Sequence, residues 1–97
     1  MVKHIILWKI KDGVDKKAVA QGVKDGLEGL VGVVPGLTKV SVIIRGLDSS
    51  NADIMLDSEL ESVQALKDYQ AHPAHQAVAN DKVRPYMQVR LCMDYEI

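Results

Sequence analysis

The C-terminal segment carries the pattern that most restricts what this chain can fold into. From Met87 to Ile97, apolar residues occupy every second position without a break, and the positions between them hold Gln88, Arg90, Cys92, Asp94 and Glu96. A period of two is the repeat of a β-strand, whose side chains point alternately to the two faces of a sheet. The segment therefore predicts a half-buried strand with one apolar and one polar face.

Three earlier segments also predict strands. Val2–Lys11 alternates with both of its faces apolar at the centre, which is typical of a central strand covered on both sides. Leu37–Arg45 is rich in β-branched residues, and Ile54–Leu60 places its apolar residues on one face and Met55, Asp57 and Glu59 on the other.

The segment after the first strand predicts a helix that begins at the N-cap Asp15 and is ended by Pro35-Gly36. Its apolar stripe consists of Val19, Val23, Leu27, Leu30, Val31 and Val34. The helix also holds four glycines, each costing up to about 1 kcal/mol relative to alanine: Gly22, Gly26, Gly29 and Gly32. We interpret them as a tolerated surface weakness, the alternative being a close approach of a neighbouring backbone.

A second helical region follows the third strand and begins at the N-cap Ser62. Its predicted inner face is shared by Val63, Leu66, Lys67 and Gln70, with Tyr69 at the edge. Pro73 interrupts this helix and favours the start of another one that runs to about Val83.

The predicted order is β-α-β-β-α-β, which is the ferredoxin-like arrangement of the α+β class. Both helical regions cover the same face of such a sheet, so the other face must meet water, a ligand or a second sheet. On the first strand, one side carries His4, Ile6, Trp8 and Ile10, a set too apolar for water if it lies on the uncovered face.

Composition narrows the class of protein further. The 97 residues suit a single domain spanning 1–97, and the net charge of −1 argues against a nucleic-acid partner. No apolar run approaches the roughly 18 to 20 residues of a membrane span, and none resembles a secretory signal. The single Cys92 cannot form an intramolecular disulfide, which favours a reducing, cytoplasmic location.

Four segments together resemble a known family. They are Lys3-His4-Ile5-Ile6-Leu7-Trp8, Val34-Pro35-Gly36-Leu37, Tyr69-Gln70-Ala71-His72-Pro73-Ala74-His75 and Asp94-Tyr95. On these segments the chain is similar, over nearly its whole length, to the stress-responsive dimeric α/β-barrel (A/B barrel) domain family. The resemblance implies a homodimer whose sheets pack face to face into a dimeric α/β barrel, which would cover the second sheet face. It also implies a cofactor-free protein that binds a small molecule between sheet and helices, with no established reaction.

A few plant members of that family, of the olivetolic acid cyclase type, imply a second hypothesis. They cyclise a linear polyketide through residues that match Tyr69 and His75 here, although the position matching Ile54 is polar in the cyclase. An aldol reaction needs a base and a hydrogen-bond donor, so this hypothesis is a cofactor-independent lyase or cyclase with His75 as base and Tyr69 as proton donor. His75 would occupy position N3 of its helix, whose positive end keeps the imidazole neutral, and Asp94 could accept a hydrogen bond from it.

The remaining candidate residues for substrate binding are His4, Trp8, His72 and Asp94, and the enzyme hypothesis predicts that His4, Tyr69 and His75 line one cavity. Each has a structural alternative: His72 could simply cap a helix, Tyr69 could be a core residue, and His75 could serve a hydrogen-bonded structural role. We expect no metal site, because no cysteine or carboxylate stands at ligand spacing from the histidines. A third hypothesis, a haem-degrading monooxygenase of the wider dimeric barrel group, lacks a distinctive haem-ligand segment.

Overall fold

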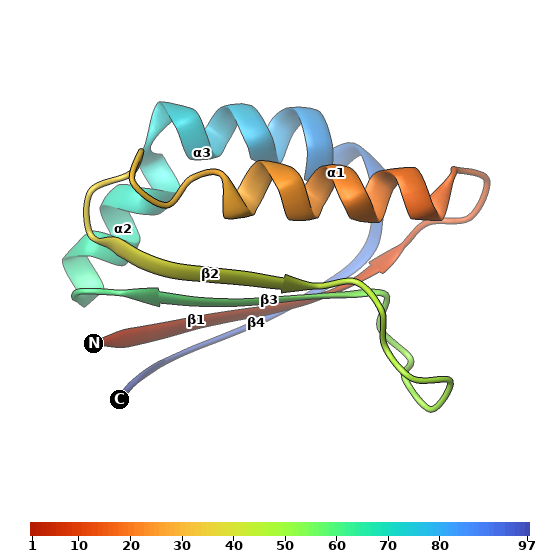
Figure 1. Cartoon of the computed structure of the whole chain (residues 1–97), viewed down its shortest axis with the longest axis horizontal. Helices are drawn as coiled ribbons and strands as arrows, with labels where there is room; N and C mark the ends of the chain where they lie inside the picture. Colours follow the sequence, from red (N-terminus) through yellow and green to blue (C-terminus); the bar gives the residue numbers. More distant parts are fainter.

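The computed structural model describes all residues from 1 to 97 and confirms the α+β, ferredoxin-like order (Figure 1). The elements are β1 (Val2–Ile10), α1 (Lys16–Glu28), β2 (Leu37–Ile43), β3 (Ile54–Leu60), α2 (Val63–Ala71), α3 (Pro73–Val78), a π-helical turn (Ala79–Val83), a 3-10 turn (Arg84–Tyr86) and β4 (Met87–Glu96). The sheet has the order β2-β3-β1-β4, and every neighbouring pair is antiparallel. All three helices lie on the same side of the sheet.

Strand β1 is central, as predicted, because it pairs with β3 on one side and β4 on the other. Its buried residues His4, Ile6, Trp8 and Ile10 face the helices and form the middle of the core. The side turned away from the helices carries Ile5 and the exposed Leu7 instead. These four residues, which the sequence marked as too apolar to face water, therefore lie on the sheet face that the helices cover.

Strand β4 departs from the prediction of a half-buried strand. It is an edge strand, and its apolar residues point to the sheet face that carries no helix, where Leu91, Met93 and Tyr95 are all exposed. The alternation was recognised correctly, but the apolar side has no cover within the protomer. We call the surface formed by Leu91, Met93 and Tyr95, together with the exposed Leu7 and Ile43, the outer apolar face.

Helix α1 ends at Glu28 with Gly29 as C-cap, well before the predicted stop at Pro35. Successive turns continue the chain, because the amide of Leu30 donates to the carbonyl of Leu27 and that of Val34 to the carbonyl of Leu30. These turns still bury Leu30 and Val34 in the core, so the apolar spacing survives without a continuous helix.

The glycines of α1 are not all a surface weakness. A Cβ atom on Gly26 would lie 2.8 Å from Cγ1 of Val78 in α3, which is closer than real contacts allow. Gly26 therefore lets α1 and α3 pack closely, and the interpretation as a tolerated weakness is wrong at this position. At Gly22 the nearest atom is Cδ of Lys82 at 3.7 Å, so a side chain would fit there.

The second helical region begins as predicted, since the Ser62 side chain accepts a hydrogen bond from the amide of Ala65. Its buried residues are Leu66 and Tyr69, whereas Val63 is exposed. The buried face is therefore centred nearer to Tyr69 than the prediction placed it. Tyr69 lies fully inside the core and not at its edge. None of the helices combines the length and apolar character that a bilayer crossing requires.

Candidate small-molecule site

A cavity of about 240 Å³ opens between the sheet and the helices. Of the thirteen residues that line it, eight are apolar, and Trp8 and Leu56 from the sheet face Leu27 of α1 and Val83 across it. Tyr69 is one of these eight and also brings a hydroxyl group to the wall. The five polar residues of the lining are His4, Gln70, His75, Arg84 and Arg90. An apolar chamber with a few convergent polar groups is the usual form of a small-molecule site.

The hydroxyl of Tyr69 has no partner. The side chain is fully buried, and its oxygen makes no hydrogen bond with the protein although it stands on the cavity wall. Burial raises the pKa of Tyr69 to about 12, so the hydroxyl keeps its proton at neutral pH. A buried, unsatisfied hydroxyl costs about 1 to 3 kcal/mol, and an acceptor on a bound molecule would remove that cost.

His75 stands beside Tyr69, with the ring centroids 4.4 Å apart. Its Nδ1 lies 3.2 Å from the carbonyl oxygen of Gln70, and because a carbonyl only accepts, Nδ1 carries the proton and Nε2 is left with a free lone pair. Burial lowers the pKa of His75, with further lowering by the charges of Arg84, His4 and Arg90 against a raising contribution from the Gln70 carbonyl. The ring stands at N3 after Pro73, as predicted, and burial is the largest cause that keeps the pKa low and the ring neutral.

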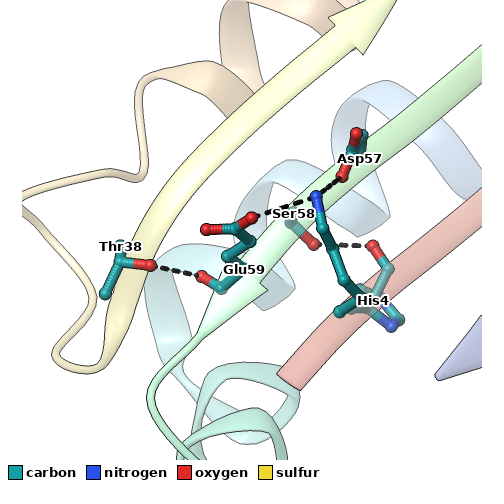
Figure 2. A network of polar contacts seen from close by, with 6 residues as sticks. His4, Thr38, Asp57, Ser58 and Glu59 are labelled. Atoms are coloured by element: carbon teal, nitrogen blue, oxygen red, sulfur yellow. Dashed lines mark hydrogen bonds and ion pairs between the residues drawn. The ribbon is translucent and has the colours of Figure 1, made fainter. Parts of the chain in front are cut away.

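The carboxylate of Asp94, which was expected to contact His75, contacts His4 instead. Nδ1 of His4 lies 2.5 Å from Oδ1 of Asp94, because the β1–β4 register sets these two residues directly opposite each other. The predicted hydrogen bond from His75 to Asp94 is therefore wrong. The backbone of His4 is fixed as well, since the buried Ser58 hydroxyl of β3 donates to the His4 carbonyl at 2.8 Å (Figure 2).

The same strand pairing brings Cys92 next to this pair. Its Sγ lies 3.8 Å from Nδ1 of His4 and donates to Oδ1 of Asp94 at 3.5 Å, so three atoms able to ligate a metal gather within 4.8 Å. The absence of ligand spacing in the sequence did not reveal this group, because its contacts span about 90 residues of sequence. Burial and the charge of Asp94 raise the pKa of Cys92, which leaves it a protonated thiol and a poor nucleophile.

The structure brings four of the candidate residues together on the cavity wall, namely His4, Trp8, Tyr69 and His75. Asp94 stands behind His4 and is not part of the lining. His72 lies outside it too, and its Nδ1 accepts a hydrogen bond from the amide of Ala74 at 3.0 Å as the N-cap of α3. Ile54, the position that departs from the cyclase, is buried in the core but does not line the cavity.

Three polar residues of the lining were not predicted, and these are Gln70, Arg84 and Arg90. Arg90 had a usable signal, because it lies on the same polar side of β4 as Asp94, a candidate residue. Arg84 had none, because its position follows from the π-helical and 3-10 turns that connect α3 to β4.

Comparison with known proteins gives a consistent family assignment. The family model described as Stress responsive A/B Barrel Domain matches residues 2–97. Among curated proteins, the stress-response A/B barrel domain-containing protein HS1 of Arabidopsis thaliana is 33% identical, over 76% of this chain and 70% of its own. An uncharacterised protein of Streptomyces coelicolor is 35% identical, over 79% of this chain and 81% of its own.

The fold also matches a solved structure over almost its full length. A dimeric protein of unknown function and ferredoxin-like fold from Bacteroides fragilis superimposes with a TM-score of 0.91. It is 30% identical in sequence, and the match covers 99% of this chain and 95% of the other.

Proposed function

The chain belongs to the stress-responsive A/B barrel domain family, and on that premise we propose that it is a homodimeric protein that binds a small organic molecule in the cavity between its sheet and its helices. The observation that carries the proposal is the unpartnered hydroxyl of Tyr69 on the wall of that cavity. Proteins rarely leave a buried polar group without a hydrogen bond, so this hydroxyl requires an explanation, and a bound molecule with an acceptor supplies one.

The outer apolar face supports the homodimer. Met93 is 69% exposed and Leu91 62% exposed on a sheet face that no helix covers, and they continue into Leu7 and Tyr95. A contiguous apolar patch of this kind on a small protein is typical of an interface. The related protein from Bacteroides fragilis is described as dimeric. In a dimer built on these faces, the helix-side cavity stays open to ligands in each protomer.

Two further parts of the proposal rest on chemistry alone. The cysteine thiol is free and exposed, which suits the cytoplasm, where thiols stay reduced. No nucleic-acid partner is proposed, because a net charge of −1 gives no surplus of cations for a phosphate backbone.

A second candidate function is a cofactor-independent lyase or cyclase acting on a small carbonyl compound. It is favoured by the pairing of a neutral imidazole with a protonated phenol on one wall, His75 beside Tyr69. Nε2 of His75 would take the proton from a carbon between two carbonyls, and Tyr69 would hold the enolate oxygen through its hydroxyl. The enolate carbon would then attack a third, more distant carbonyl of the same molecule, and the resulting alkoxide would recover the proton from His75.

The binding proposal is tested through Trp8, the only tryptophan of the chain, which lines the cavity. Titration with a set of small organic compounds should change its fluorescence with saturation at one site per chain. If no compound in a broad set alters Trp8 emission, the cavity is a packing defect and the proposal is wrong. The lyase candidate requires turnover of a β-dicarbonyl substrate that carries a further, distant carbonyl, and this turnover should be lost in His75→Gln. Equal turnover in this variant removes His75 as the base.

A further inference from the structure

The cavity carries positive charge and no negative charge. Its lining includes Arg84 and Arg90 together with two histidines, but no aspartate or glutamate. The whole chain is slightly acidic, with 13 acidic against 12 basic residues, so this imbalance is local to the cavity. A site of one sign of charge attracts ligands of the opposite sign.

Neither arginine has a carboxylate partner in the protein. The ion pairs of the chain involve lysines and His4, and none includes Arg84 or Arg90. Arg84 donates only to neutral oxygens, those of the Gln76 and Asn80 side chains. Its guanidinium is thereby oriented but not neutralised, and most of its hydrogen-bonding capacity is unused.

The two arginines stand at the exposed side of the lining, whereas Tyr69 is fully buried within it. The lining also includes apolar side chains such as Ile6, Trp8 and Val83. The cavity thus combines exposed cations, apolar walls and a buried, unsatisfied hydrogen-bond donor. This combination matches a molecule with an anionic group, an apolar body and a second oxygen that accepts a hydrogen bond.

Resting on the proposed small-molecule function, we infer that the ligand of this cavity is an organic carboxylate whose head group pairs with Arg84 and Arg90 and whose inner carbonyl or hydroxyl oxygen accepts from Tyr69. Guanidinium groups bind carboxylates with shorter and stronger hydrogen bonds than they form with neutral oxygens. A cavity of about 240 Å³ accommodates an acid with a small ring or a short chain.

The test compares carboxylic acids with their neutral primary amides, which have nearly the same shape. The probes are a panel of oxo acids with different apolar bodies, such as 4-oxo-4-phenylbutanoate, each paired with its amide, and the readout is Trp8 fluorescence. We expect the acids to bind at least about tenfold more tightly than their amides, because charge-assisted hydrogen bonds are the stronger ones. This preference should shrink at high salt, where exposed charges are screened.

Substitution separates this inference from the function on which it rests. Arg84→Gln and Arg90→Gln should each weaken acid binding more than amide binding and so reduce the preference for the acid. Arg45→Gln is the matched control, since Arg45 does not line the cavity and also has no ion pair. Equal affinity for acid and amide would overturn the carboxylate inference and leave the binding function standing. Failure of every acid and every amide to bind would overturn both.

Discussion

The rings of Tyr69 and His75 lie with their centroids 4.4 Å apart and their planes tilted by 51°, both on the wall of the cavity. They come from α2 and α3, which are separated by the helix break at Pro73. Because the break turns the chain between them, two residues six positions apart can face the same space. One then supplies a free imidazole nitrogen and the other an unpartnered hydroxyl.

Removing the orphaned hydroxyl should stabilise the protein. Tyr69→Phe deletes a buried oxygen that has no hydrogen bond, so we expect the free energy of unfolding to rise by about 1 kcal/mol without ligand. Chemical denaturation measures the change, with Tyr86→Phe as control because Tyr86 is only half-buried and does not line the cavity. Destabilisation of Tyr69→Phe by more than about 1 kcal/mol would mean that the hydroxyl has a partner in solution.

His75 should make the protein lose stability in mild acid. Burial lowers its pKa below the ordinary 6.5, so as pH falls through 6.5 the unfolded chain takes up a proton that the folded state still refuses. The contribution of neutral His75 to the free energy of unfolding is fully present above pH 6.5, and it decreases as the pH falls toward the pKa of the folded state. The pH dependence of unfolding should flatten in this window in His75→Gln. An NMR titration that placed the folded pKa at or above 6.5 would contradict the account.

The close approach of α1 and α3 predicts opposite effects for two similar substitutions. Gly26→Ala puts a Cβ 2.8 Å from Val78, so it should destabilise the fold by about 1 to 3 kcal/mol although alanine favours helices. Gly22→Ala meets only a flexible lysine at 3.7 Å and should stabilise by up to about 1 kcal/mol. The double variant Gly26→Ala with Val78→Ala should recover part of the loss relative to the sum of the single changes. Equal stabilisation by both alanines would refute the packing argument.

The outer apolar face predicts the assembly state. Met93→Lys places a charge in the middle of that face, so the homodimer should dissociate and the sedimenting mass should fall from twice 10.7 kDa to one chain. Val33→Lys is the control, because Val33 is exposed to a similar degree but lies in the turns after α1. A wild-type protein that sediments as a stable monomer at micromolar concentration would show that the outer apolar face is not a homodimer interface.

Much of the fold follows from local periodicity, because Val2–Lys11 and Met87–Ile97 each reveal which residues share a face. Periodicity does not say which face the helices cover, and that is why β4 was expected to be half-buried and is exposed in the protomer. Helix α1 ends early at the C-cap Gly29. The turns that follow still bury Leu30 and Val34, so the apolar spacing does not require a continuous helix.

The candidate site was predictable where its residues are adjacent in sequence and unpredictable where they are not. Tyr69 and His75 belong to one segment and were found through it. The contact of His4 with Asp94 depends on a strand register, which no local pattern specifies, so the carboxylate was first assigned to the wrong histidine. The placement of Arg84 and Arg90 on one cavity wall was also unpredictable, because it depends on how distant segments pack together.

The central claim is that the cavity beside Tyr69 binds a small molecule, and filling the cavity tests it most directly. Ala79 is buried on the cavity wall, whereas Ala77 is exposed and does not line the cavity, so Ala79→Phe and Ala77→Phe form a matched pair. Calorimetric titration with the tightest compound from the Trp8 screen should show at least a tenfold loss of affinity in Ala79→Phe, a smaller loss in Ala79→Leu and none in Ala77→Phe. Undiminished binding to a folded Ala79→Phe protein would contradict the account.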